Sequence, residues 1–239
     1  MKRTDFTLKP SLIAMLAAAT LLTACGDDDD DTVVVTPPAP VMQTFTVTVT
    51  NLTANQPMSP VILASHASDA MLWNAGEMAS EALEKMAEGG DTADIAALSV
   101  IKSSVNGTGL LMPGMSETLT LTLDEADVAS ISLATMLVNT NDAFTGINSY
   151  TIAGMEVDAT TAMKFMAYDA GTEANSEAKG TMPGPADGGE GFNASRDDVD
   201  FVHIHPGVIS MYDGLADSVL GASHRFDNPV LAVTIMRTE

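Results

Sequence analysis

The sequence predicts an all-β protein, an antiparallel β-sandwich with one short helical insertion. Threonine alternates with apolar residues over residues 44–50 and 118–123, which is the period of a strand with one buried face. Helical periodicity is confined to residues 77–98, and Gly, Asp and Pro gather between the apolar runs. Many short strands separated by polar loops are typical of a two-sheet sandwich.

Short strands make up most of the domain that we expect at residues 43–239. Besides the two alternating segments, strands are expected at 60–65, 131–138, 161–168, 200–205 and 230–236. The segment 131–138 is a continuous apolar run, whereas the patterns of 161–168 and 200–205 are mixed. Loops rich in Gly and Asp are expected at 139–149, 169–195 and 206–229.

The helical insertion is expected over residues 77–88, with a shorter helical turn within 92–98. Met78 and Met86 fall on one face of such a helix, while most of its glutamates lie elsewhere. The pair Gly89–Gly90 should end the helix, because glycine readily adopts the left-handed conformation found there.

The N-terminus resembles the signal peptide of a bacterial lipoprotein. Basic residues are followed by an apolar run from Ser11 to Leu22, shorter than the ~20 residues that span a bilayer. The run ends in Leu22-Thr23-Ala24-Cys25, which matches a lipobox, the motif at which the cysteine is acylated and the preceding bond is cut. We therefore predict a signal peptide at residues 1–24 and lipidation of Cys25. The alternative is an ordinary signal peptide with an incidental cysteine.

Lipidation of Cys25 would anchor the mature protein in the membrane of the cell envelope. Gly26 follows the cysteine, whereas the inner-membrane retention signal of enteric bacteria has Asp there, so we expect the outer membrane, at its periplasmic face or the cell surface. Residues 25–42 contain consecutive aspartates and several prolines and are expected to form an extended tether. Because Cys25 is the only cysteine, no disulfide can stabilise the fold.

The chain is strongly acidic, with a formal net charge of −22. Removing residues 1–24 takes away three basic residues and one acidic residue, which brings the charge to −24. Such a surface repels nucleic acid, so we exclude nucleic acid as a partner. The charge suits either solubility in a salty medium or cation binding, and charge alone does not decide between them.

Familiar catalytic motifs are absent, including Gly-x-Ser-x-Gly, His-Glu-x-x-His and a phosphate-binding Gly loop with Lys. We therefore do not expect an enzyme. His203 and His205 share one face of an expected strand, a spacing that can bind a transition metal. Without an evident third soft ligand, a packed or surface pair is the simpler interpretation. The alternative function is a metal-assisted hydrolase of the cell envelope that uses the acidic loops.

Two acidic loops each follow an expected strand. The first contains Asp142, and the second contains Asp169 and Glu173, with Gly171 permitting a bend between them. Calcium takes six to eight oxygen ligands, which carboxylates, amide carbonyls and main chain supply on bent loops. If both loops lie at one end of the sandwich, these carboxylates can converge on a calcium ion. Otherwise the two loops are ordinary turns.

Three ordered motifs resemble the spondin N-terminal domain of animal F-spondin and mindin, and bacterial spondin-domain lipoproteins are more similar still. The first is His66-Ala67-Ser68-Asp69-Ala70-Met71-Leu72-Trp73, followed by Gly76, Ala79-Ser80-Glu81 and Ala87-Glu88. The second comprises the apolar strand from 131, then Asp142 and Gly146, and the third is Asp169-Ala170-Gly171-Thr172-Glu173. The likeness extends over residues 43–237.

The resemblance implies a two-sheet sandwich with calcium bound near the loop ends, and it assigns Asp142 and Asp169 as ligands. Glu173 stands where the family has aspartate, and Glu117 is a loose candidate for a further family carboxylate. Ala143 replaces the tryptophan of the animal proteins and the family's cysteines are missing, so their adhesion partners transfer poorly. We expect a lipid-anchored extracytoplasmic binding or adhesion module whose partner is an unidentified protein or glycan.

Overall fold

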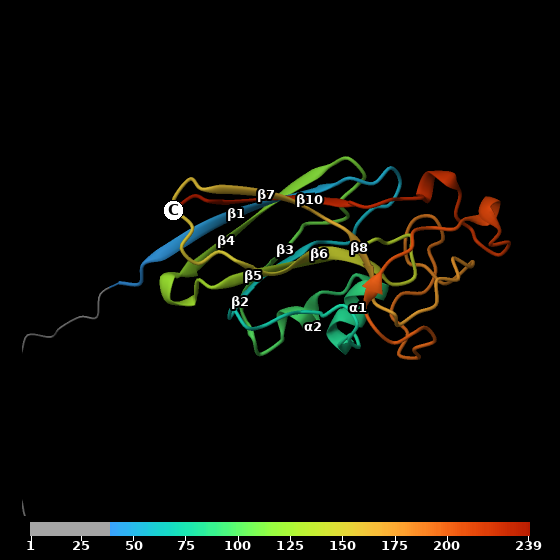
Figure 1. Ribbon diagram of the computed structural model, residues 1–239, viewed down its shortest axis with the longest axis horizontal. Helices are drawn as coiled ribbons and strands as arrows, with labels where there is room; N and C mark the ends of the chain where they lie inside the picture. Colours follow the sequence, from blue (N-terminus) through green and yellow to red (C-terminus); the bar gives the residue numbers. More distant parts are fainter. Residues whose placement is uncertain (1–38) are drawn as a thin grey trace, which may run out of the picture. The chain divides into compact units, whose positions relative to one another are not determined.

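The computed structural model describes residues 39–239, which form two antiparallel β-sheets packed face to face (Figure 1). The all-β sandwich expected from the sequence is confirmed. The predicted signal peptide at 1–24, the lipidation site Cys25 and most of the tether at 25–42 lie outside the described residues, and they remain predictions.

One sheet has four strands in the order β4-β1-β10-β7. The strands are β1 (Met42–Asn51), β4 (Ser116–Asp124), β7 (Thr160–Phe165) and β10 (Leu231–Arg237). The expected alternation is present, and the register aligns it across the sheet: Val47 of β1 lies opposite Leu119 of β4 and Ile235 of β10. All three are buried, so one row of apolar side chains faces the interior.

The other sheet has six strands in the order β3-β2-β5-β6-β8-β9. They are β2 (Ile62–His66), β3 (Ile101–Asn106), β5 (Ser130–Met136), β6 (Ala143–Thr151), β8 (Ala167–Asp169) and β9 (His203–Ile204). Every residue of β5 is buried. Both faces of the sheet are covered at this central strand, which explains its apolar residues and the burial of its small polar residues Ser130, Ser132 and Thr135.

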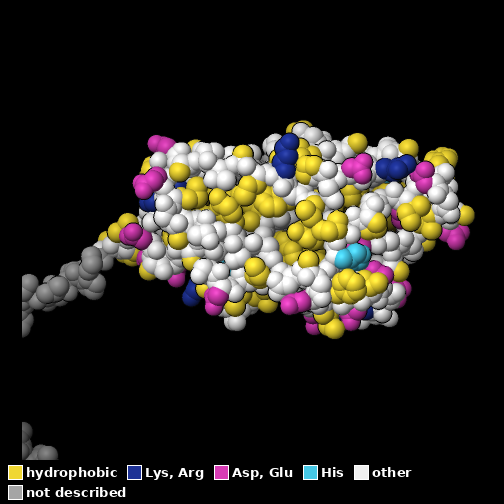
Figure 2. All heavy atoms as spheres, in the orientation of Figure 1, with side chains coloured by type: hydrophobic (Ala, Val, Ile, Leu, Met, Phe, Trp, Pro, Cys, Tyr) yellow, Lys and Arg dark blue, Asp and Glu magenta, His cyan; other side chains and the backbone are white. Residues whose placement is uncertain are grey.

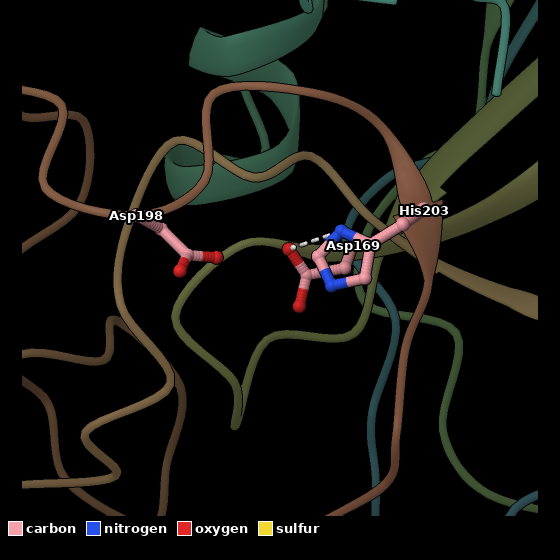
Figure 3. A group of neighbouring side chains, drawn as sticks. All are labelled: Asp169, Asp198 and His203. Carbon is pink, nitrogen blue, oxygen red and sulfur yellow. Dashed lines mark ion pairs between the residues drawn. The ribbon is translucent and has the colours of Figure 1, made fainter. Parts of the chain in front are cut away.

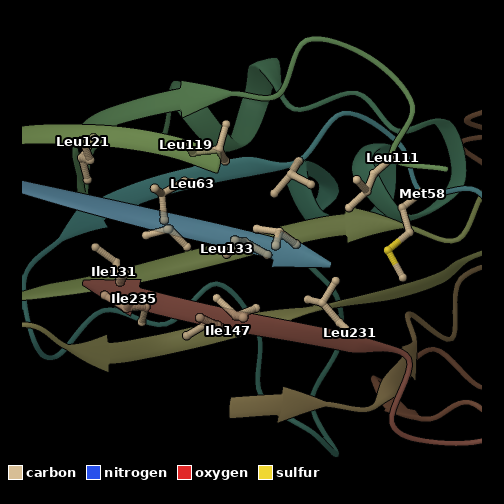
Figure 4. Packing of buried hydrophobic residues seen from close by; sticks show 14 of the residues in the cluster. Met58, Leu63, Leu111, Leu119, Leu121, Ile131, Leu133, Ile147, Leu231 and Ile235 are labelled. Carbon is tan, nitrogen blue, oxygen red and sulfur yellow. The ribbon is translucent and has the colours of Figure 1, made fainter. Parts of the chain in front are cut away.

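The first covered face is the interior of the sandwich (Figure 4). Leu121 and Ile235 from the four-stranded sheet belong to one buried cluster with Leu63, Leu133 and Ile147 from the six-stranded sheet. None of the five is more than 3 % exposed. Since burying such a side chain stabilises by about 1.5–3 kcal/mol, this cluster holds the two sheets together.

The second covered face is the outer side of the six-stranded sheet, where the helical insertion lies (Figure 1). Its helices are α1 (Glu81–Gly89) and α2 (Ala93–Ala96), and short 3-10 turns occur elsewhere at Glu125–Asp127, Met211–Asp213 and Ala222–His224. Leu83 and Met86 of α1 belong to a buried cluster with Trp73 and Phe144. The Trp73 and Phe144 rings meet edge to face, with centroids 5.2 Å apart. No helix within residues 39–239 is long and apolar enough to cross a membrane.

The helix α1 begins later than the predicted start at Glu77. Ser80 caps it, because its side chain accepts a 3.2 Å hydrogen bond from the backbone N–H of Leu83. Met78 therefore precedes the helix and is 65 % exposed, and its predicted place on the buried helical face was wrong. The expected helical turn within 92–98 is observed as α2.

The expected strand at 161–168 is in fact two strands in different sheets. The first part, β7, pairs with β10 in the four-stranded sheet, and the second part, β8, pairs with β6 in the six-stranded sheet. Met166 lies between them and is 41 % exposed. The mixed pattern arises because the buried side of the chain changes where it passes from one sheet to the other.

The expected loop at 139–149 is also partly wrong, because β6 begins at Ala143. The first residues of β6 are buried on both faces, so no alternation marks them as a strand. Gly146 allows β6 to approach β5 closely, since a Cβ at this position would collide with the carbonyl oxygen of Leu133. The strand β3 was not predicted either.

We expect Gly146→Ala to lower the free energy of unfolding by about 1–3 kcal/mol, because the added methyl group forces β6 away from β5. Urea unfolding monitored by circular dichroism measures the change. Gly109→Ala is the control, since nothing lies within 4 Å of a Cβ at Gly109. Equal stability of both variants would refute the close approach.

Candidate metal centre

Strand pairing brings the acidic residues together at one end of the six-stranded sheet. Asp142 directly precedes β6, and Asp169 is the last residue of β8. Asp169 lies opposite Ala143 of β6 on one side and opposite His203 of β9 on the other. The two predicted acidic loops are therefore neighbours, although 27 positions of sequence separate the two aspartates.

Asp142 is fully buried, and only one of its carboxylate oxygens is satisfied. Its Oδ2 accepts hydrogen bonds from the backbone N–H groups of Thr172, at 2.8 Å, and Glu173, at 3.1 Å. Its Oδ1 is buried and has no hydrogen-bond partner within the described part of the chain. An unpartnered buried oxygen of this kind is costly, so it is a candidate ligand atom.

Asp169 is also fully buried, and a short network fixes its orientation. Its Oδ1 accepts from the backbone N–H of Gly171 at 2.8 Å, and its Oδ2 accepts from the side-chain amide of Asn175 at 2.6 Å. His205 in turn fixes the orientation of Asn175. The Nδ1 atom of His205 accepts a hydrogen bond from the N–H of Gly207, so its Nε2 atom carries the proton. This Nε2–H donates to Asn175 Oδ1 at 2.9 Å.

The charges at this centre are poorly balanced. Burial, together with the neighbouring charge of Asp169, raises the pKa of Asp142 to about 8, although N–H donors from the second loop oppose the shift. Burial lowers the pKa of His205 to about 4, so this imidazole is neutral at pH 7. On the face of the molecule in Figure 2, Lys and Arg side chains are few.

Glu173 lies at the edge of the centre and faces differently from the two aspartates. Its backbone N–H bonds to Asp142, but its carboxylate accepts a 3.1 Å hydrogen bond from the side-chain amide of Asn141. Burial raises its pKa to about 7, and the nearby Glu88 carboxylate adds to the shift. The Glu88 carboxylate is itself buried, with one oxygen bonded to the N–H of Asn193 and the other without a partner among residues 39–239.

Asp198 and His203 complete a group around Asp169 that can hold a metal ion (Figure 3). One ligand atom from each of these three residues lies within 4.8 Å of the other two. Sequence analysis missed Asp198 and treated His203 as packed or exposed. The available signal was the three aspartates at 197, 198 and 200, which lie a few residues before the paired histidines.

Glu117, the loose candidate for a further ligand, performs a different task. Its carboxylate accepts a 2.8 Å hydrogen bond from the backbone N–H of Thr108 and so secures the turn between β3 and β4. It does not belong to the group around Asp169. Glu81 is an exposed helix residue that pairs with Lys85 at 2.8 Å.

A match to a known family model identifies the family of this chain. The family model described as Spondin_N matches residues 48–182, which is more than half of the 239 residues. The chain belongs to the spondin N-terminal domain family. No curated protein matches the chain. The match supports an extracellular binding or structural module.

The three spondin motifs have distinct places in the fold. The first forms the outer layer: His66 is buried, with Nε2 2.7 Å from the hydroxyl of Ser132, and Trp73 packs under α1. The second and third supply Asp142 and Asp169. Asp198 and His203 lie beyond the matched range, in the C-terminal part of the domain.

We predict that the metal-free chain loses stability as pH rises. The folded-state pKa of Asp142 is raised from 3.8 to about 8, so its favourable contribution is complete below about pH 4 and is lost as pH rises through 8. Urea unfolding in chelator from pH 5 to 8, at fixed ionic strength, measures the slope. Asp142→Asn should flatten it, whereas Asp127→Asn, in the exposed turn before β5, should not. An unchanged slope in Asp142→Asn would contradict the assignment.

Proposed function

We propose that this spondin-family protein is a lipid-anchored, extracytoplasmic binding or adhesion module with a structural calcium site. The observation that carries the proposal is the buried pair of carboxylates at Asp142 and Asp169, with Asp142 Oδ1 left without a partner. Family membership supports a role as a binding or structural module rather than as a catalyst.

A cation offsets the main cost of this arrangement. Two adjacent carboxylates repel one another, and burial removes the water that would screen them. Within residues 39–239, the ion pairs of Asp169 within 4.0 Å involve His203 and His205, and of these His205 is neutral. The carboxylate and amide oxygens present here suit a hard cation such as calcium. Asp142 and Asp169 would hold the ion, with Glu173 close to it.

The ion would act by joining loops that face solvent to a rigid sheet. The loop after Asp169 already bonds through Thr172 and Glu173 to Asp142. A shared ion adds a second connection between the same segments. Loops fixed on a rigid scaffold are common binding surfaces, and the partner would be a protein or a glycan.

A metal-assisted hydrolase of the cell envelope is the alternative, and the burial of both aspartates argues against it. Catalysis needs a concave site in which titratable groups converge. Asp142 and Asp169 are both 0 % exposed, so a substrate has no direct access to either carboxylate. The carboxylates are better suited to holding loops than to acting on a substrate.

Calcium should raise the melting temperature of the purified chain, and chelator should lower it. At a hundredfold excess over Kd, ligand binding stabilises by about 2.7 kcal/mol, which corresponds to about 5–10 °C for a domain of this size. Differential scanning calorimetry measures the shift. Asp169→Asn should remove most of it, while Asp127→Asn should retain it. If metal analysis finds no ion, and neither calcium nor chelator changes the melting temperature, the acidic loops are only turns.

Membrane attachment should depend on Cys25. We expect Cys25→Ser to yield unlipidated protein that no longer fractionates with membranes, because the acyl chains are the proposed anchor. Labelling with a radioactive fatty acid and membrane fractionation measure the two effects. A variant that keeps both its label and its membrane association would disprove the lipoprotein assignment.

A further inference from the structure

We infer that the cation held by Asp142 and Asp169 is also bound by Asp198 and His203, so that the site takes a first-row transition-metal ion such as Zn²⁺ as well as calcium. The inference rests on the proposed cation site but concerns residues outside the three spondin motifs. It follows from the position of the segment 196–203, its hydrogen bonds and the chemistry of imidazole.

Backbone hydrogen bonds hold Asp198 beside the second acidic loop. The N–H of Asp197 donates to the carbonyl oxygen of Thr172 at 3.1 Å, and the N–H of Asp200 donates to that of Gly171 at 2.7 Å. These bonds flank Asp198 on both sides. Its carboxylate is half-buried and lies among the metal-ligating group with Asp169 (Figure 3).

Arg196 fixes the same segment from the helical side. Its guanidinium donates to the buried Glu84 carboxylate at 2.6 Å and to the carbonyl oxygen of Ala79 at 2.8 Å. It also pairs with Asp200 at 2.7 Å. The segment carrying Asp198 is thus attached both to α1 and to the loop after β8, which gives Asp198 a defined position before any ion binds.

His203 is placed by β-sheet pairing, opposite Asp169. Its Nδ1 lies 3.6 Å from Asp169 Oδ1 and 3.2 Å from the carbonyl oxygen of Phe201. Nδ1 is therefore the ring nitrogen nearest to Asp169, and as a ligand it would leave the proton on Nε2. The His203 side chain is 31 % exposed, so an ion can reach it from solvent.

His205 is excluded as a ligand, although it is the other member of the histidine pair. Both of its ring nitrogens have partners, one in Asn175 and one in the N–H of Gly207. It orients Asp169 through Asn175, so it is a positioning residue. The two histidines therefore have separate tasks, which their spacing in the sequence does not reveal.

The unpartnered Asp142 Oδ1 is the independent observation that points to an ion at this centre. The backbone N–H of Thr172 bonds to Asp142 Oδ2, and its carbonyl oxygen accepts from the N–H of Asp197, so one residue joins Asp142 to the segment that carries Asp198. Asp169, Asp198 and His203 supply a mixed oxygen and nitrogen donor set, to which the proposal adds Asp142. Imidazole suits zinc and related ions, whereas calcium strongly prefers oxygen, so the two metals should depend differently on His203.

Isothermal titration of the untagged chain with Zn²⁺ and with Ca²⁺ tests this difference. We expect His203→Gln to weaken Zn²⁺ binding at least about tenfold and Ca²⁺ binding much less, since changes even behind a metal ligand typically cost 10–100-fold. Asp198→Asn should weaken both. His224→Gln, in a C-terminal turn, and Asp127→Asn are the matched controls. Any binding that persists in Asp169→Asn comes from elsewhere, for example from Asp27–Asp31.

A second measurement does not depend on any variant remaining folded. Loading the wild-type chain with Co²⁺ should give one strongly shifted imidazole signal in the proton NMR spectrum. Wild-type Zn²⁺ affinity in both His203→Gln and Asp198→Asn, or a Co²⁺ spectrum without that signal, overturns the inference. If calcium still raises the melting temperature in that case, the proposed function stands. If neither metal binds the wild-type chain, both proposals fail.

Discussion

Two carboxylates buried side by side, those of Asp142 and Asp169, impose the constraint on which this end of the molecule depends. Burying one charge without compensation is costly, and burying two like charges together is more so. Backbone N–H groups from the loop after β8 and the side-chain amide of Asn175 donate hydrogen bonds to the two carboxylates. One oxygen of Asp142 remains unmatched. Hydrogen bonding therefore relieves only part of the cost, and the proposed cation would offset the remainder.

The six-stranded sheet supplies the rigidity that such a centre needs. Its central strands are covered by the sandwich interior on one face and by α1, Trp73 and neighbouring residues on the other. Phe144, two residues after Asp142, packs against both Trp73 and Tyr168, and Tyr168 directly precedes Asp169. The aromatic cluster therefore anchors the strand ends that carry the two aspartates. The first spondin motif thus supports a centre to which it contributes no ligand.

The C-terminal part of the domain extends this arrangement beyond the matched family range. The segment before β9 brings Asp198 and His203 to Asp169, and Arg196 attaches that segment to α1. Asp169, Asp198 and His203 consequently lie close together, although they are up to 34 positions apart in the sequence. The ion and the protein segments around it would reinforce each other, since each reduces the electrostatic or conformational cost of the other.

The sequence by itself determined the sandwich class, the strands with strict alternation and the family, because period-two burial and ordered motifs are local signals. It did not reveal β6, where burial on both faces removes the alternation, nor the change of sheet at Met166. It located Asp142 and Asp169 through their motifs. Only the tertiary structure decided that Asp198 and His203 join Asp169 and that Glu173 turns toward Asn141. Strand register and loop hydrogen bonds set those positions, and both depend on contacts between segments far apart in the chain.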